Sequence, residues 1–269
     1  MRPYSTTGFD RLEMSIGGIR TAAYIAGSGP DVVYLHGSGT FHGFEFARQW
    51  LSRFRVLLPY HPGFGESADA PAMQTVQDYV RHYRALLDAL GLQRIHLVGA
   101  SLGGRLAAQF TIAHPDRVRS LVLVAPAGIV LPDFPQPDFS RIQYHDWPHY
   151  LVHNPEAIRR YWPDDPDEAF LAARAREASA VGRILGAARA TAQDFTRLLD
   201  RIKSPTLLVW GREDRMMPAG NARAWHALIA NSRVEMIEGA GHLLLDESAA
   251  ARAVVARFMV ESETPGPST

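Results

Sequence analysis

The sequence predicts one α/β domain in which a mostly parallel central sheet has helices on both faces and carries an inserted helical lid. Two patterns support this prediction. Short apolar runs alternate with stretches of helical periodicity over most of the chain, and one segment rich in proline and aromatic residues interrupts the alternation. Alternating strands and helices form crossover units, which build a parallel sheet. A length of 269 residues suits one such domain with an insertion.

The first part of the domain, residues 1–128, shows the alternation clearly. We expect strands at 12–16, 21–25, 32–35, 54–58, 95–98 and 121–124, and helices at 76–90 and 102–114. The strands are short apolar runs bounded by turn residues, and the helices carry apolar residues at intervals of three and four. Gly17 and Gly18 form the expected turn between the first two strands, and Gly91 stands where a helix commonly ends.

The alternation stops at residue 129 and resumes at residue 204. We predict that residues 129–203 form the helical lid, with helices at 156–161, 168–180 and 192–199 and no strand. Residues 204–260 return to the core pattern, with strands at 206–210 and 233–237 and helices at 220–229 and 247–260. The polar, proline-bearing residues 261–269 are expected to be a disordered tail.

Composition restricts the classes of function. The chain has 28 Lys and Arg residues against 28 Asp and Glu residues and has no long basic run, so nothing favours nucleic acid as a partner. It has no cysteine, which excludes disulfides, thiolate catalysis and cysteine-ligated zinc. No window approaches the roughly 20 apolar residues needed to span a bilayer, and residues 1–10 do not resemble a signal peptide. We therefore expect a cytoplasmic protein that acts on a small molecule.

Ser101 is the candidate nucleophile. It is the centre of Gly99-Ala100-Ser101-Leu102-Gly103, a G-x-S-x-G motif between an expected strand and an expected helix. A serine on such a sharp turn has a strained backbone, and glycines two positions away on each side avoid collisions. The alternative is a chance pentapeptide at the start of a helix, which the flanking strand and helix disfavour.

A serine hydroxyl needs a base, and the base needs an orienting acid. His242 is the candidate base and Asp214 the candidate acid, because each lies on a loop just after an expected strand. Glu213 is a rival acid on the same loop. Taken singly, Asp214 could cap the following helix and His242 could be an ordinary loop residue. The order serine, acid, histidine is nevertheless the one found in α/β-hydrolases rather than in chymotrypsin or subtilisin.

The oxyanion of an acyl-transfer reaction needs two amide donors that are already in place. One expected donor is the Leu102 N–H, directly after the nucleophile. The other is expected in the loop His36-Gly37-Ser38-Gly39, from the Ser38 N–H in the first place and from Gly39 in the second. The glycines of this loop allow the backbone to approach a ligand closely.

These motifs together resemble the α/β-hydrolase superfamily, in particular its lid-bearing serine esterases and meta-cleavage product hydrolases. The matching segments span nearly the whole chain except the lid, and they are 36–39, 63–67, 99–104, 210–214 and 239–242. The resemblance implies that Asp214 is the triad acid and that Ser38 and Leu102 supply the oxyanion donors. A serine at position 101 argues against the branches that use an aspartate nucleophile.

The chain departs from this family pattern at three positions. Tyr60 replaces an aspartate that many relatives carry, which puts the hydrogen bonding of the following turn in question. Thr40 and Leu243 stand where meta-cleavage product hydrolases carry proline and tryptophan, which weakens the reading as a carbon–carbon hydrolase.

The function expected from these residues is hydrolysis of a small carboxylic ester through an acyl-enzyme, with no cofactor and no metal. The alternative is carbon–carbon bond hydrolysis of the meta-cleavage type, and a third hypothesis is a non-catalytic binder with the same fold. His145, His149 and His153 recur four apart, a spacing that on a helix would place them on one face like metal ligands. Pro148 between them argues against a regular helix, so surface or packing histidines are the favoured interpretation.

The substrate is expected to be partly apolar, because aromatic residues are frequent in the lid. The same aromatics could equally well serve only to pack the lid on the core. The residues expected to line the pocket are Gly37, Gly39, Phe41, Trp147, Met217 and Leu243. The sequence does not indicate an oligomeric state.

Overall fold

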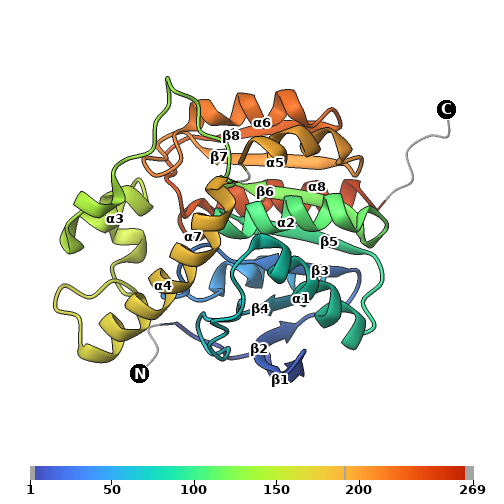
Figure 1. Cartoon of the computed structure of the whole chain (residues 1–269), viewed down its shortest axis with the longest axis horizontal. Coiled ribbons are helices and arrows are strands. Elements are labelled where there is room, and N and C mark those ends of the chain that lie inside the picture. The colour runs from blue at the N-terminus through green and yellow to red at the C-terminus, as the bar shows by residue number, and fades with distance from the viewer. Residues whose placement is uncertain (1–3, 191, 264–269) are drawn as a thin grey trace.

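The computed structural model describes residues 4–190 and 192–263, which form an eight-stranded sheet with helices around it (Figure 1). The strand order is β1-β2-β4-β3-β5-β6-β7-β8. The strands are β1 Asp10–Ile16, β2 Ile19–Ala26, β3 Asp31–Leu35, β4 Arg55–Pro59, β5 Ile95–Ala100, β6 Val118–Val124, β7 Thr206–Gly211 and β8 Ser232–Ile237. Only the β1–β2 and β2–β4 pairs are antiparallel, and every other neighbouring pair is parallel. The mostly parallel sheet is therefore confirmed.

The hairpin at the sheet edge closes through two glycines. Ile16 pairs with Ile19, so that only Gly17 and Gly18 lie between the strands. Both have positive φ angles, of 58° and 81°. A two-residue turn of this kind matches the twist of the two strands, and glycine adopts it without steric cost.

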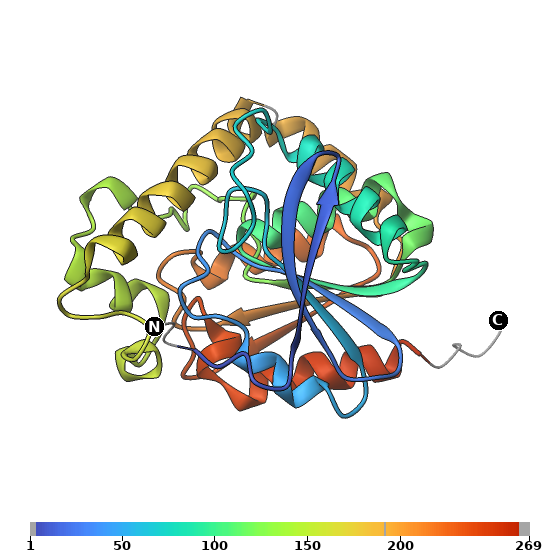
Figure 2. The same cartoon turned by 90° about the horizontal axis from the view of Figure 1, so that it is seen from below.

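Helices cover both faces of the sheet, as predicted. Figure 2 shows α1 (Val76–Ala89) and α2 (Leu102–Ala113) on one side of the strands, and α8 (Ala249–Glu261) with the 3-10 helix Glu45–Trp50 on the other. The start of α1 is fixed by a capping box, in which Thr75 and Asp78 bond each other's backbone N–H groups. The last part of the chain also contains α6 (Ala222–Leu228) and the single turn α7 (Leu244–Glu247).

Between β6 and β7, the described residues form only helices, 3-10 turns and loops. We call residues 129–203 the helical insertion. Its helices are α3 (Trp147–Leu151), α4 (Glu168–Ala190) and α5 (Ala192–Leu198). Figure 1 places α3 and the first turns of α4 to one side of the sheet. The start of the insertion is tied to the core, because the Ala127 N–H donates to the Ser101 carbonyl at 2.9 Å.

Two expectations about the insertion were wrong in detail. The helix expected at 156–161 is a 3-10 turn, Pro155–Ile158, because the Asn154 side chain accepts from the Glu156 N–H and Pro155 begins the turn. The helix expected to end at residue 180 continues to Ala190. Gly182 and Gly186 in the extra turns lower helix propensity but do not break the helix.

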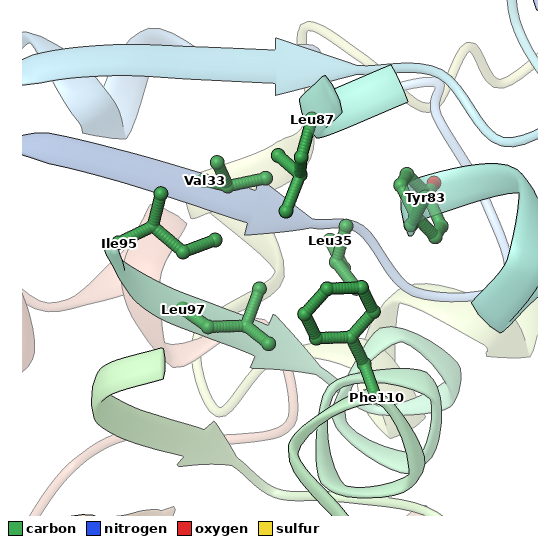
Figure 3. Close-up of a pocket in the computed structure, with 7 residues that line it drawn as sticks. All are labelled: Val33, Leu35, Tyr83, Leu87, Ile95, Leu97 and Phe110. Carbon is green, nitrogen blue, oxygen red and sulfur yellow. The ribbon is translucent and has the colours of Figure 1, made fainter. Parts of the chain in front are cut away.

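The core beneath the sheet is close-packed. Figure 3 shows a small void of about 10 Å³ near α1 and α2, lined by Val33, Leu35, Tyr83, Leu87, Ile95, Leu97 and Phe110. This volume corresponds to about one water molecule, and its lining is almost entirely apolar, so it is a packing defect rather than a ligand site.

The C-terminal end of the described chain contacts the core. Of the expected tail 261–269, residues 264–269 lie outside the described residues, whereas Glu261 is the last residue of α8. The Glu263 carboxylate lies 2.5 Å from Nε2 of the buried His96. Among the described residues, no helix is both long and apolar enough to cross a membrane.

Candidate active site

The candidate residues gather at one edge of the sheet. β3, β5, β7 and β8 are parallel, so their carboxyl ends point to the same edge. Ser38 follows β3, Ser101 follows β5, Asp214 follows β7 and His242 follows β8. This edge is where open α/β sheets bind their ligands.

Ser101 stands in a strained conformation between β5 and α2. Its φ angle is 52° and its ψ angle −116°, a region that residues with a Cβ rarely adopt. The backbone around it is fully engaged. Its N–H donates to the Val124 carbonyl, and its own carbonyl accepts from the N–H groups of Gly104, Arg105 and Ala127 at 3.0, 3.2 and 2.9 Å. These bonds hold the serine on the turn in spite of the strain.

The glycines of the motif are there for steric reasons. A Cβ at Gly99 would lie 2.3 Å from the Gly103 carbonyl oxygen, and a Cβ at Gly103 would lie 2.0 Å from the Leu35 carbonyl oxygen. Real Cβ atoms do not approach backbone this closely. A Cβ at Gly37 would lie 3.3 Å from the Ser101 Cβ, so the loop after β3 runs directly beside the serine.

His242 and Asp214 are hydrogen-bonded to each other. The His242 Nδ1 and the Asp214 Oδ2 are 2.9 Å apart, and both side chains are buried. The other carboxylate oxygen, Oδ1, accepts the backbone N–H groups of Met216 and Met217 at 2.9 and 2.8 Å. The carboxylate is thereby fixed in orientation. Since Nδ1 donates its proton to this carboxylate, Nε2 of the imidazole is left free to accept one.

Two further carboxylates hold the histidine loop, and sequence reasoning gave them no such role. Glu213 accepts the Ala240 N–H at 3.0 Å, and Glu247 accepts the Gly241 N–H at 2.8 Å. Three consecutive residues of the loop, 240–242, are thus each bound to a different carboxylate. Glu213, the rival acid, contacts backbone rather than the imidazole.

The loop after β3 is supported by a pair of buried histidines. The His61 N–H donates to the His36 Nε2 at 3.0 Å, and the His36 Nδ1 donates to the Gly37 carbonyl at 2.7 Å. The His61 Nε2 donates to the His36 carbonyl at 2.8 Å, and the Tyr83 hydroxyl bonds the His61 Nδ1. Each imidazole therefore has one donor and one acceptor nitrogen in use, which is the neutral form.

Burial keeps both histidines neutral. Loss of solvation lowers the pKa of His61 to about 3 and lowers the pKa of His36 well below its usual value. The two histidines support the backbone of the loop that carries Ser38.

The two expected oxyanion donors lie at this edge of the sheet. Ser38 is exposed to solvent. Leu102 is the first residue of α2, so its N–H has no hydrogen-bond partner inside the helix.

The turn after Tyr60 forms normally despite the missing aspartate. The Ser67 hydroxyl donates to the Tyr60 carbonyl at 2.8 Å, and the Ser67 N–H donates to the Phe64 carbonyl at 3.0 Å. Tyr60 is buried, and its hydroxyl lies 2.9 Å from that of Tyr4.

An apolar cluster joins the insertion to the loops of the site, and we call it the aromatic wall. Its buried members are Phe41, Leu151, Val152, Ile158 and Tyr161, and Tyr4, Trp147, Trp162, Phe170, Met216 and Leu243 pack against them. Three of the expected pocket residues thus lie in the wall, whereas Met217 belongs to the main core. The Leu243 N–H donates to the Leu151 carbonyl at 2.7 Å, which joins the histidine loop to the wall.

The loop after β3 also meets polar groups that sequence reasoning missed. His42 lies 3.1 Å from the Asp246 carboxylate, so this loop is tied to α7 behind the histidine loop. Arg174 of α4 also contacts this loop. A Cβ added at Gly39 would lie 2.9 Å from its guanidinium, which packs over the Phe41 ring. These partners are more than 130 residues apart in sequence, so no local pattern predicts the contacts.

The histidines considered as metal ligands lie in the insertion. His145 belongs to the 3-10 turn Tyr144–Asp146, His149 lies in α3, and His153 follows that helix, with Pro148 in its first turn. Within residues 4–190 and 192–263, no three His, Asp or Glu side chains are close enough together to hold a metal ion.

Comparison with known proteins agrees with this architecture. The family model described as "Alpha/beta hydrolase family" matches residues 32–257. An uncharacterized protein of Mycobacterium tuberculosis is 30% identical, over 93% of this chain and 81% of its own length. A 2-hydroxy-6-oxo-6-phenylhexa-2,4-dienoate hydrolase of Comamonas testosteroni is 29% identical, over 81% of this chain and 82% of its own.

Among solved structures, a thermophilic esterase from Thermogutta terrifontis superposes with a TM-score of 0.75. It is 24% identical, and the alignment covers 95% of this chain and 100% of the esterase. This likeness concerns the fold. Together with the family match over most of the sequence, it shows that the chain belongs to the alpha/beta hydrolase family of enzymes.

Proposed function

We propose that the protein is a serine hydrolase that cleaves a small, partly apolar carboxylic ester through an acyl-enzyme. Ser101 is the proposed nucleophile, His242 the base and Asp214 the orienting acid. The observation that carries this proposal is the 2.9 Å contact between the His242 Nδ1 and the Asp214 Oδ2, at the sheet edge where Ser101 has its strained turn. No cofactor and no metal are needed for this chemistry.

In the proposed mechanism the His242 Nε2 takes the proton of the Ser101 hydroxyl as its oxygen attacks the ester carbonyl. The carbonyl oxygen becomes an anion, which the N–H groups of Ser38 and Leu102 stabilise. Collapse breaks the ester bond, and the imidazolium gives its proton to the departing alcohol. A water molecule, deprotonated by the same Nε2, then attacks the acyl-enzyme. The carboxylic acid leaves, and Ser101 recovers its proton.

The first experiment measures hydrolysis of short p-nitrophenyl esters by the wild type and by Ser101→Ala. We expect the wild type to turn these esters over and the variant to be slower by at least about 10³-fold, because it lacks the hydroxyl that attacks the ester in this proposal. A fluorophosphonate should label the wild type at Ser101. A variant that retains wild-type turnover would refute the role of Ser101, and a wild type that resists labelling would favour the non-catalytic hypothesis.

Carbon–carbon hydrolysis of a dienoate is the second candidate, and Arg174 favours it. The relative from Comamonas testosteroni is named for a dienoate, which is a carboxylate. The Arg174 side chain is mostly buried beside Gly39, and its Nε has no hydrogen-bond partner within the described residues. A substrate carboxylate would satisfy it. Against this candidate, Glu177 already pairs with Arg174 at 2.7 Å.

One assay that compares ester and dienoate substrates distinguishes the two candidate functions. A dienoate substrate loses its visible absorbance on cleavage, so turnover is followed directly beside that of the ester panel. We expect kcat/KM for the best ester to exceed that for the dienoate. The reverse order would assign the protein to the second candidate while leaving the roles of Ser101, His242 and Asp214 in place.

A further inference from the structure

A buried carboxylate joins the insertion to the loop that carries Ser38. Glu177 lies in the middle of α4, and only 2% of it is exposed to solvent. Its Oε1 accepts the Thr40 hydroxyl at 2.5 Å and the Gly65 N–H at 3.1 Å. Its Oε2 accepts the Thr40 N–H at 3.2 Å. One side chain from the insertion thus binds two separate loops of the core.

The burial of this charge is compensated. A carboxylate out of water is costly unless it is paired and hydrogen-bonded. The Arg174 guanidinium lies 2.7 Å from the Glu177 Oε2, one turn earlier on the same helix, and the three donors of Thr40 and Gly65 complete the shell. Since both oxygens accept at least two donors, the carboxylate has a single orientation and fixes its partners accurately.

Thr40 lies two residues after Ser38, and the loop between them contains glycine at position 39. A glycine-containing loop has little conformational preference of its own, so its path depends on what holds its ends. The His36–His61 pair holds one end, and Glu177 holds the other. The direction of the Ser38 N–H is set between these two anchors.

We propose that Glu177, through Thr40, is a positioning residue for the oxyanion donor at Ser38. The insertion would then contribute to the chemical step as well as to the aromatic wall. This inference rests on the proposed function, because it assumes that the Ser38 N–H stabilises an oxyanion. Displacing such a donor by a fraction of an ångström weakens the transition state more than the bound substrate.

Two substitutions test the proposal at its two ends. Thr40→Val keeps the shape and the N–H but removes the hydroxyl donor. Glu177→Gln keeps the shape but has only one acceptor oxygen, so its NH2 must face one of the two pairs of donors. We expect kcat to fall about tenfold in Thr40→Val and about 10- to 100-fold in Glu177→Gln, with KM within about twofold of the wild type. Thr40→Ser, which retains both donors, should restore kcat.

A matched control variant, Arg176→Met, separates positioning of the Ser38 N–H from general attachment of α4 to the core. Arg176 directly precedes Glu177 on α4. It donates to the carbonyls of Gly63, Gly65 and Ser67 and pairs with Asp69, and none of these bonds involves Thr40. Arg176→Met therefore loosens the same helix from the core but leaves the Ser38 loop held. We expect a lower melting temperature with kcat close to that of the wild type.

Affinity for a boronic acid, which forms a tetrahedral adduct on the serine, gives a second readout. It should fall in Thr40→Val and Glu177→Gln by the same factor as kcat/KM. An unchanged kcat in both variants would overturn the inference, as would an equal loss in Arg176→Met. A rise in kcat for Glu177→Gln would also overturn it, since it would mean that the negative charge merely opposes the oxyanion. Retained turnover in Ser101→Ala would instead refute the proposed function itself.

Discussion

Replacing Asp214 by asparagine is the sharpest test of the proposed triad, because the structure fixes which way the new side chain must turn. The Asp214 Oδ1 accepts the N–H groups of Met216 and Met217, at 2.9 and 2.8 Å. The single oxygen of asparagine will stay with these two donors. Its NH2 group is then forced into the place of Oδ2, 2.9 Å from the His242 Nδ1. Two donors cannot face each other, so Nδ1 must become the acceptor, and the proton moves to Nε2.

The size of the effect follows from that tautomer. With a proton on Nε2, His242 cannot accept the proton of Ser101, and kcat should fall by about 10³- to 10⁴-fold. This corresponds to about 4–5.5 kcal/mol of lost transition-state stabilisation. Folding should change little, by about 1 kcal/mol, because the two backbone bonds to position 214 remain.

The neighbouring carboxylate supplies the control. Glu213→Gln removes a negative charge at almost the same place, but its amide oxygen can still accept the Ala240 N–H. We expect its kcat within about threefold of the wild type. Initial rates on the best ester, measured with the melting temperature of each variant, show whether Asp214 or Glu213 is the acid that orients His242. A Glu213→Gln variant as impaired as Asp214→Asn, or an Asp214→Asn variant with a tenth of wild-type turnover, would contradict the reasoning.

Three further predictions follow from particular residues. Ser101→Gly relieves the strain of the positive φ of 52°, so the melting temperature measured by calorimetry should rise by about 2–4 °C while turnover is abolished. Ser101→Ala keeps the Cβ, and its melting temperature should not rise. Gly103→Ala places a Cβ 2.0 Å from a backbone carbonyl oxygen and should destabilise the fold by about 3 kcal/mol or more in urea, whereas Gly182→Ala on α4 meets no atom within 4 Å and should stabilise it by about 0.5–1 kcal/mol. Because burial lowers the pKa of His61 to about 3, the unfolded chain binds a proton between pH 6.5 and 3 that the folded chain does not. This contribution to stability is complete above pH 6.5 and falls by up to about 1.4 kcal/mol per pH unit below it, so His61→Gln should show a shallower pH dependence of the unfolding free energy.

Much of the sheet could be predicted because its signals are local. Most of the strands are short apolar runs that end at turn residues, and the G-x-S-x-G glycines stand within two positions of Ser101 in the sequence. The order of the motifs along the chain then places their loops at one edge, since parallel strands share a direction. The contact between His242 and Asp214 follows from this arrangement.

The parts that could not be predicted depend on distant partners. Glu177 contacts Thr40 across 137 positions, and His42 contacts Asp246 across 204. The first pair depends on how the insertion packs on the core and the second on how two core segments meet, and hydrophobic periodicity carries no information about either contact. The helix expected at 156–161 failed for a local reason, because Asn154 and Pro155 set a tighter turn that outweighs the helix propensity of the following residues.

The hydrogen bond from the Ala127 N–H to the Ser101 carbonyl has a consequence for protein engineering. It ties the point where residues 129–203 leave the core to the backbone of the proposed nucleophile, so a different insertion grafted after Ala127 would leave this bond to the Ser101 turn in place. A grafted insertion would bring its own wall and hence its own substrate range. It would work at full speed only if it also supplied a carboxylate where Glu177 stands, facing the Thr40 side chain.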